Sequence, residues 1–196
     1  MRSVLIAAAA AAGLFVLAGC GGSTEPAKQG TTAPVSGAAP AAAAAAGEVG
    51  AAGSTCPMPV TFKVAEKWKP QASDPGTKLG GAELLCEIDA KPAGSIGYVR
   101  VLLAKGVTDP MAALQAYTAV GKNSGFEYKD VQVGGVAAKE VSYTAKSMDI
   151  DLPNQVLAVP VGGDVALVTV SSIDADLFKE ILPAFELAKS SLKLTA

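Results

Sequence analysis

The chain has 196 residues, 16 basic and 18 acidic side chains, a formal net charge of −2 and a hydrophobic content of 50%. This near balance of charges provides no basic surface for nucleic acid or anionic lipid, so nucleic acid is not expected as a partner. The chain contains no histidine. That excludes Ser/His/Asp and Cys/His catalytic arrangements and histidine metal sites, and we expect neither a metal ion nor a cofactor.

The N-terminal segment has the features of an export signal. Arg2 supplies a positive charge, and residues 4–19 form an uncharged apolar run. This run is too short to span a bilayer comfortably, since roughly 20 residues are needed, but it has the length of a signal-peptide core. We therefore predict a signal peptide over residues 1–19.

The tetrad Leu17-Ala18-Gly19-Cys20 resembles the lipobox of bacterial lipoproteins. The resemblance implies that the Cys20 thiol receives a diacylglycerol and that the chain is cut just before this residue. The mature protein would then be anchored on the extracytoplasmic face of the cell membrane, because two or more acyl chains give stable anchoring. The competing interpretation is an ordinary secreted protein in which Cys20 has no such role.

The segment that follows is of low complexity. Residues 20–54 are rich in Gly, Ala, Pro, Ser and Thr and contain no aromatic side chain. Such a segment cannot bury enough apolar surface to offset the entropy lost on ordering it. The alanine run 41–46 favours helix but is too short to form one stably in water. We predict a lipidated, flexible tether over residues 20–54 and a single globular domain over residues 55–196.

Two cysteines remain once Cys20 is assigned to the lipid, namely Cys56 and Cys86. An exported protein lies in an oxidising compartment, which favours a disulfide between them. On the chain-entropy estimate the bond would stabilise the domain by about 3.5 kcal/mol. Two buried free thiols are the alternative. Zinc is disfavoured because the thiols have no close potential ligands.

Alternating and β-branched patterns predict several strands in the domain. They are expected over residues 59–65, 82–90, 96–104, 136–146, 154–161 and 164–172. The turn residues Gly162 and Gly163 join the last two strands into a hairpin. Pro160 places the first arm of this hairpin at a sheet edge or at a bulge.

Amphipathic patterns predict two helices. One begins near Asp109 and Pro110 and ends near Gly121, and the other begins at Asp174. Pro183 lies inside the second helix and is expected to kink or interrupt it. The order of strands and helices predicts an α+β fold in which an antiparallel sheet has helices packed on it.

Four sequence features mark the expected domain between residues 60 and 194. They are an early strand that ends at Trp68, a helix with the core AALQAY, a GGVAA turn into a strand, and a C-terminal helix that ends in SSLKL. Together they resemble the PsbP-like (Mog1p-like) fold. Actinobacterial envelope lipoproteins of the LpqN type belong to this fold group and also have a lipobox and a low-complexity tether. The resemblance brings no catalytic residues, and it implies an adaptor or partner-binding module.

Two acidic groups are candidate sites. Asp149 and Asp151, with Asn154, form a cluster in a predicted loop that could bind calcium weakly, although a solvated turn is the simpler interpretation. Glu87 and Asp89 alternate on a predicted strand, as paired catalytic carboxylates do, but they also suit the polar face of that strand.

The aromatic residues are candidates for a binding surface. Trp68 is the single tryptophan and could be an exposed anchor for a partner or a sugar, or could cover the edge of the core. The tyrosines lie on predicted elements and are expected in the core or at its boundary rather than in a binding platform. They are Tyr98, Tyr117, Tyr128 and Tyr143.

The sequence favours a binding function over an enzymatic one. It contains no G-x-S-x-G, Walker-type or dinucleotide-binding motif before a predicted helix. We expect a lipid-anchored extracytoplasmic protein whose domain binds another envelope protein. The alternative is a carrier or sensor of a small apolar ligand, held in a pocket between the sheet and the helices. A third hypothesis is an enzyme that uses only carboxylates, lysines or serines.

Overall fold

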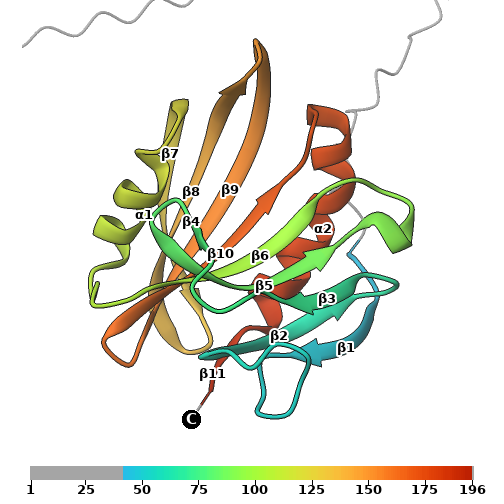
Figure 1. Ribbon diagram of the computed structural model, residues 1–196, viewed down its shortest axis with the longest axis vertical. Helices are drawn as coiled ribbons and strands as arrows, with labels where there is room; N and C mark the ends of the chain where they lie inside the picture. Colours follow the sequence, from blue (N-terminus) through green and yellow to red (C-terminus); the bar gives the residue numbers. More distant parts are fainter. Residues whose placement is uncertain (1–41, 196) are drawn as a thin grey trace, which may run out of the picture. The chain divides into compact units, whose positions relative to one another are not determined.

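Two antiparallel sheets and two α-helices make up the part of the chain described by the computed structural model, residues 42–195 (Figure 1). The predicted signal peptide and Cys20 lie outside these residues. Among residues 42–195, no helix has the length and apolar character needed to cross a membrane.

The larger sheet has eight strands. Seven follow one another in the order β3 (Lys69–Ala72), β5 (Ala82–Asp89), β6 (Tyr98–Ala104), β10 (Asp164–Ser171), β9 (Ile150–Val161), β8 (Val136–Ser147) and β7 (Lys122–Val133), and β4 (Lys78–Leu79) pairs with β5. The smaller sheet has the order β1 (Ala45–Val49), β2 (Val60–Ala65) and β11 (Lys193–Leu194). A 3₁₀ turn, η1 (Lys91–Ala93), links β5 to β6.

The helices lie on opposite faces of the larger sheet. Helix α2 (Ala175–Ser191) and the smaller sheet cover one face, where Phe185 and Ile181 pack with Phe62 of β2. Helix α1 (Pro110–Thr118) covers the other face, where Leu114 packs with Leu167 of β10. Each of these side chains is at most 1% exposed. The predicted α+β architecture is therefore confirmed, with a separate apolar core on each face of the sheet.

Strand β5 contributes to both cores because its register shifts between Leu84 and Cys86. Leu84 belongs to the α1 core, whereas Cys86 and Ile88 belong to the α2 core. An extra residue in one strand reverses the side-chain alternation beyond it, which explains how apolar residues at even spacing face two directions.

The predicted helices are present with small changes. Asp109 and Asp174 cap α1 and α2, and their side chains accept hydrogen bonds from main-chain N–H groups of the first turn. Helix α2 continues through Pro183 instead of being interrupted there. The expectation that Pro160 places its strand at a sheet edge is wrong, because β9 lies between β10 and β8; the proline is tolerated because it lies beyond the last residue of β9 that pairs with β8.

The predicted tether boundary at residue 54 is wrong, because β1 lies within it. β1 pairs with β2, and Val49 is 3% exposed. Main-chain hydrogen bonds hold this segment on both sides, from Glu66 N to Ala44 O at 2.8 Å and from Met58 N to Gly50 O at 2.9 Å. Backbone pairing orders the strand, so side-chain composition gave no indication of it.

Two further features differ from the sequence-based expectation. Strand β7 was not predicted at all. Strands β8 and β9 form a long hairpin whose turn consists of Met148 and Asp149, both with positive φ. The segment expected to be an acidic loop therefore lies in this turn and at the start of β9.

Candidate functional site

The disulfide between Cys56 and Cys86 is present, with a Cα–Cα distance of 5.8 Å. Cys56 lies in the connection between β1 and β2, and Cys86 lies on β5. Both residues are at most 1% exposed. The bond links the connection that follows β1 to the larger sheet, which makes it a structural rather than a reactive cysteine pair.

Three of the four candidate carboxylates have polar partners in the structure. Glu87 accepts a 2.6 Å hydrogen bond from Arg100 Nε, and Asp89 accepts one from the main-chain N–H of Lys91. Asp151 lies 3.9 Å from the Lys146 ammonium on the β8–β9 hairpin. Within residues 42–195, no three His, Cys, Asp or Glu side chains come close enough to hold a metal ion.

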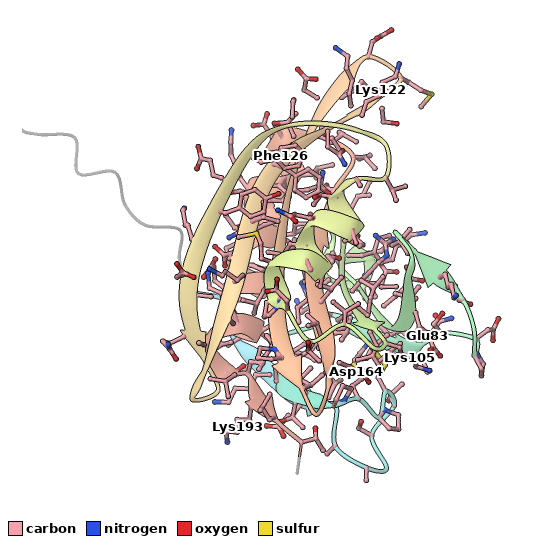
Figure 2. The ribbon with its side chains drawn as sticks, turned by 90° about the vertical axis from the view of Figure 1, so that its left-hand side faces the viewer. Glu83, Lys105, Lys122, Phe126, Asp164 and Lys193 are labelled. Carbon is pink, nitrogen blue, oxygen red and sulfur yellow. A yellow bond between two sulfur atoms is a disulfide. The ribbon has the colours of Figure 1, made fainter. Side chains whose placement is uncertain are left out.

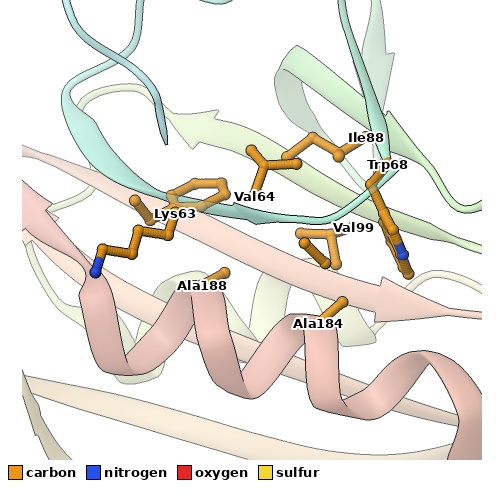
Figure 3. A pocket seen from close by; sticks show the side chains of 9 residues that line it. Lys63, Val64, Trp68, Ile88, Val99, Ala184 and Ala188 are labelled. Atoms are coloured by element: carbon orange, nitrogen blue, oxygen red, sulfur yellow. The ribbon is translucent and has the colours of Figure 1, made fainter. Parts of the chain in front are cut away.

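Trp68 is half-buried and packs against the α2 core. Figure 3 shows its ring at one end of a small cavity between β2 and α2, near Val99 and Ala184. The cavity measures about 10 Å³, which leaves room for no more than one water molecule. The interior beneath α2 is therefore packed, and Trp68 closes its edge.

A groove of about 220 Å³ lies beside α1. Tyr117 forms part of its wall and lies against Gly80, where an added Cβ would come within 2.5 Å of the tyrosine ring. Burial raises the pKa of Tyr117, and burial also raises the pKa of Tyr143 on the neighbouring strand β8. Both hydroxyls stay protonated at neutral pH and cannot act as bases. The groove is also smaller than the roughly 300–1,000 Å³ typical of ligand pockets.

The most distinctive surface is a set of exposed apolar side chains that extends from the tip of the β8–β9 hairpin along β7 and to the end of α1. Five of the nine exposed large apolar side chains among the described residues lie here. We call this set the distal patch, and its members are Val120, Phe126, Tyr128, Met148 and Ile150.

The strand registers place the patch on the α1 side of the sheet. Tyr128 lies opposite Val141, which belongs to the α1 core, and the Phe126 ring stacks on Tyr143 of the same core at 5.8 Å. Ile150 lies opposite Ser147, two residues beyond Ala145, which packs against that core. Figure 2 shows Phe126 and Lys122 near this end of the sheet, beside α1.

Hydrogen bonds and ring stacking fix the side chains of the distal patch in place. Asn123 of β7 donates hydrogen bonds to the carbonyls of Thr118 at 2.7 Å and Val120 at 2.9 Å, which joins the end of α1 to the sheet. The rings of Phe126 and Tyr128 also stack, with centroids 6.2 Å apart. Rigid aromatic side chains are favoured in protein interfaces because little entropy is lost when they bind.

Three of the four tyrosines lie where the sequence predicts, in the core or at its boundary. Tyr143 is buried, and Tyr98 and Tyr117 are half-buried at the boundary, as expected. Tyr128 is 39% exposed and belongs to the patch. The signal that could have revealed this region is a segment with aromatic residues but no alternation, residues 122–133, followed by the apolar pair Met148 and Ile150 around a turn.

Comparison with solved structures identifies the fold. The solution structure of cyanobacterial PsbP from Synechocystis superposes with a TM-score of 0.51, at 10% sequence identity, over 70% of this chain and 87% of that chain. The predicted PsbP-like fold is therefore confirmed. The crystal structure of LpqN, involved in cell envelope biogenesis of Mycobacterium tuberculosis, gives a TM-score of 0.47 at 14% identity, over 70% of this chain and 83% of that chain.

A family profile matches most of the sequence. The profile describes uncharacterised lipoproteins and matches residues 26–192, so the chain belongs to this family. It is therefore a member of this lipoprotein family, with a PsbP-like domain. No curated protein matches the sequence.

Proposed function

We propose that this protein is anchored by a lipid on Cys20 to the extracytoplasmic face of the cell membrane and that its domain binds another envelope protein through the distal patch. The observation that supports the binding function is the presence of five exposed apolar side chains on the α1 side of the sheet, among them the stacked rings of Phe126 and Tyr128. Exposed apolar side chains that gather on one face are typical of interaction sites.

The anchor rests on the lipobox and on membership of a lipoprotein family. Cys20→Ser removes the thiol that would accept the lipid. We expect the uncut precursor to accumulate, visible as a higher mass on intact-protein mass spectrometry, and the mature lipidated form to disappear. An unchanged mass and unchanged membrane retention in this variant would contradict the anchor.

The position of the patch suits a tethered binding domain. The described chain begins on the α2 side of the sheet, where Ala42 and Ala43 line a surface depression with Pro183 and Leu187 of α2. The patch lies on the other side, with α1. A partner at the patch would therefore not have to displace the segment that leads to the membrane.

The binding function is tested by cross-linking in intact membranes. The double substitution Met148→Asp and Ile150→Asp places two charges in the patch at residues that are 91% and 50% exposed. Ile173→Asp is the matched control, because Ile173 is 57% exposed and lies outside the patch, just before α2. We expect the wild-type protein and the control to cross-link to the same protein and the double variant to lose that product. Equal recovery by all three would refute the assignment of the patch.

Protein binding suits this domain better than carriage of a small apolar ligand does. The space beneath α2 measures about 10 Å³, and the groove beside α1 measures about 220 Å³. The exposed patch, by contrast, lies where a protein surface can reach it. We also propose a binding rather than a catalytic role, since the candidate carboxylates are engaged in structural hydrogen bonds.

A further inference from the structure

Strand β7 forms one edge of the larger sheet and is unusually open. It is 12 residues long and pairs only with β8 among the described strands. Every residue from Ser124 to Asp130 is exposed. An edge of this kind offers a row of free main-chain donors and acceptors to another strand, unless charged side chains or a bulge prevent pairing.

Charged side chains on β7 restrict which strand can pair with it. Glu127 and Lys129 project on the α2 side of the sheet, because Lys129 lies opposite Glu140, whose carboxylate accepts a hydrogen bond from Lys189 of α2. Neither Glu127 nor Lys129 forms an ion pair with another described residue. Both charges are therefore available to a residue on an added strand.

These charges are complementary to a second copy of the same strand in one register. In an antiparallel pair related by a twofold axis perpendicular to the sheet, the residue on the axis faces its own copy. With the axis at Glu127, Lys129 or Asp130, like charges lie directly opposite each other. With the axis at Tyr128, Glu127 faces Lys129 of the second copy and Lys129 faces its Glu127. Directly opposed unlike charges stabilise strand pairing, and like charges oppose it.

We infer that β7 is a self-complementary edge through which two copies of this protein pair, with the twofold axis at Tyr128. Such an axis keeps each face of the sheet on its own side. The two distal patches would therefore lie next to each other on the α1 side, with the Tyr128 rings in contact, while the charge pairs form on the α2 side.

The pairing is expected to be weak in dilute solution. The register of β7 on β8 shifts between Ser124 and Glu127, and Gly125 has a φ of 64°. This bulge limits the length of a regular ladder with a second copy. Confinement to a membrane raises the local concentration of tethered domains, so a weak contact suffices there. The contact itself does not require the proposed anchor or partner, because it uses the strand edge and the α2-side charges, although it shares Tyr128 with the distal patch.

Cysteine cross-linking at the axis gives a direct test. In the inferred register, Tyr128→Cys brings the two Cα atoms to about 4.5–5.5 Å, within the range that a disulfide spans. Asp130→Cys is the matched control on the same face, because its two copies would lie four residues apart, or about 13 Å. The full chain is expressed in its native membrane, oxidised with copper phenanthroline and analysed by gel electrophoresis without reductant. The wild-type protein is the control for any dimer that forms through the natural cysteines.

We expect Tyr128→Cys to give a dimer of twice the monomer mass, in at least about tenfold greater yield than Asp130→Cys. Equal yields at the two positions would indicate random collision and would overturn the inference. A product in which Tyr128→Cys is joined only to a different protein, with no dimer, would also overturn it, since the inferred occupant is a second copy.

A charge-reversal series in the Tyr128→Cys background tests the register separately. Glu127→Lys and Lys129→Glu each place like charges opposite each other at two positions, and each should lower the dimer yield about tenfold. The combination of both substitutions restores unlike pairs and should restore the yield. Failure of the combination to recover would overturn the register. Equal thermal midpoints of all variants would exclude misfolding as the cause.

The outcomes are distinguishable from those of the proposed function. Glu127→Lys leaves every residue of the distal patch in place, so it should lower the dimer yield about tenfold and preserve cross-linking to the envelope partner. Loss of the partner with Met148→Asp and Ile150→Asp, while the Tyr128→Cys dimer persists, would support both assignments separately.

Discussion

The Cys56–Cys86 disulfide offers the clearest quantitative test of the fold. The bond joins residues 30 positions apart, so it removes the freedom of a loop of about that length from the unfolded chain. The chain-entropy relation converts this constraint to about 3.6 kcal/mol at 25 °C. Replacing both cysteines by alanine should therefore lower the free energy of unfolding by about 3–4 kcal/mol, and the midpoint of thermal unfolding by about 10 °C.

Urea unfolding monitored by circular dichroism measures this effect, with wild type, reduced wild type and the Cys56→Ala/Cys86→Ala variant side by side. The reduced protein and the double variant should unfold at the same lower urea concentration, and reductant should have no further effect on the double variant. The m-value, which is the slope of the free energy of unfolding against urea concentration, should also rise, because an unfolded chain without the cross-link exposes more surface to solvent. An equally large loss of stability without a steeper slope would refute the unfolded-state explanation. An unchanged midpoint on reduction would refute the contribution of the bond altogether.

Three further substitutions test individual contacts. Lys189→Met leaves the carboxylate of Glu140, which is 5% exposed, without its partner and should cost about 3 kcal/mol or more in urea unfolding. Burial of Lys189 lowers its pKa, but hydrogen bonds to Glu140 and Glu186 outweigh this and raise the pKa above its ordinary value of 10.5. The difference between wild type and Lys189→Met should therefore be complete below about pH 10.5 and shrink as the pH rises through the raised pKa. Gly50→Ala should cost about 2 kcal/mol or more in thermal unfolding, because Gly50 has a φ of 103° and a Cβ there would lie 1.9 Å from the nearest backbone oxygen. Asp174→Ala removes the acceptor for two N–H groups of α2 and should cost about 1 kcal/mol in the same assay.

The sequence predicted those elements whose side chains carry a pattern. Phe178, Ile181 and Phe185 recur at helical spacing, and each packs in the α2 core. The capping residue Asp174 marked the start of this helix correctly. The alternating residues of β2 and the glycine turn between β9 and β10 predicted strands of the sheet in the same way. A strand that is buried on one face has an apolar side chain at every second position, and this period is visible in the sequence.

Strands β1 and β7 could not be predicted in this way. In β1, four of the five residues are exposed, and main-chain hydrogen bonds to β2 hold it in place. Strand β7 has exposed residues on both faces, so no alternation distinguishes its core side from its solvent side. The distal patch was missed for the same reason, since Phe126 and Tyr128 lie on a strand that the pattern did not reveal. In both strands, main-chain hydrogen bonds to the neighbouring strand hold the segment in place, and the side-chain pattern does not reveal them.

The position of the disulfide has a consequence for a domain held from its N-terminal side. The described chain reaches β1 first, and four of the five residues of β1 are exposed. A pull on this side therefore acts first on the β1–β2 hydrogen bonds, which can open one after another from Ala45. Cys56 follows β1 and precedes β2, and its bond to β5 fixes the chain to the larger sheet at that point. Loss of β1 would thus stop at Cys56 and leave β2 in contact with α2. If the domain is tethered as proposed, this arrangement would keep the proposed binding surface, on the opposite side of the sheet, intact while the chain is under tension.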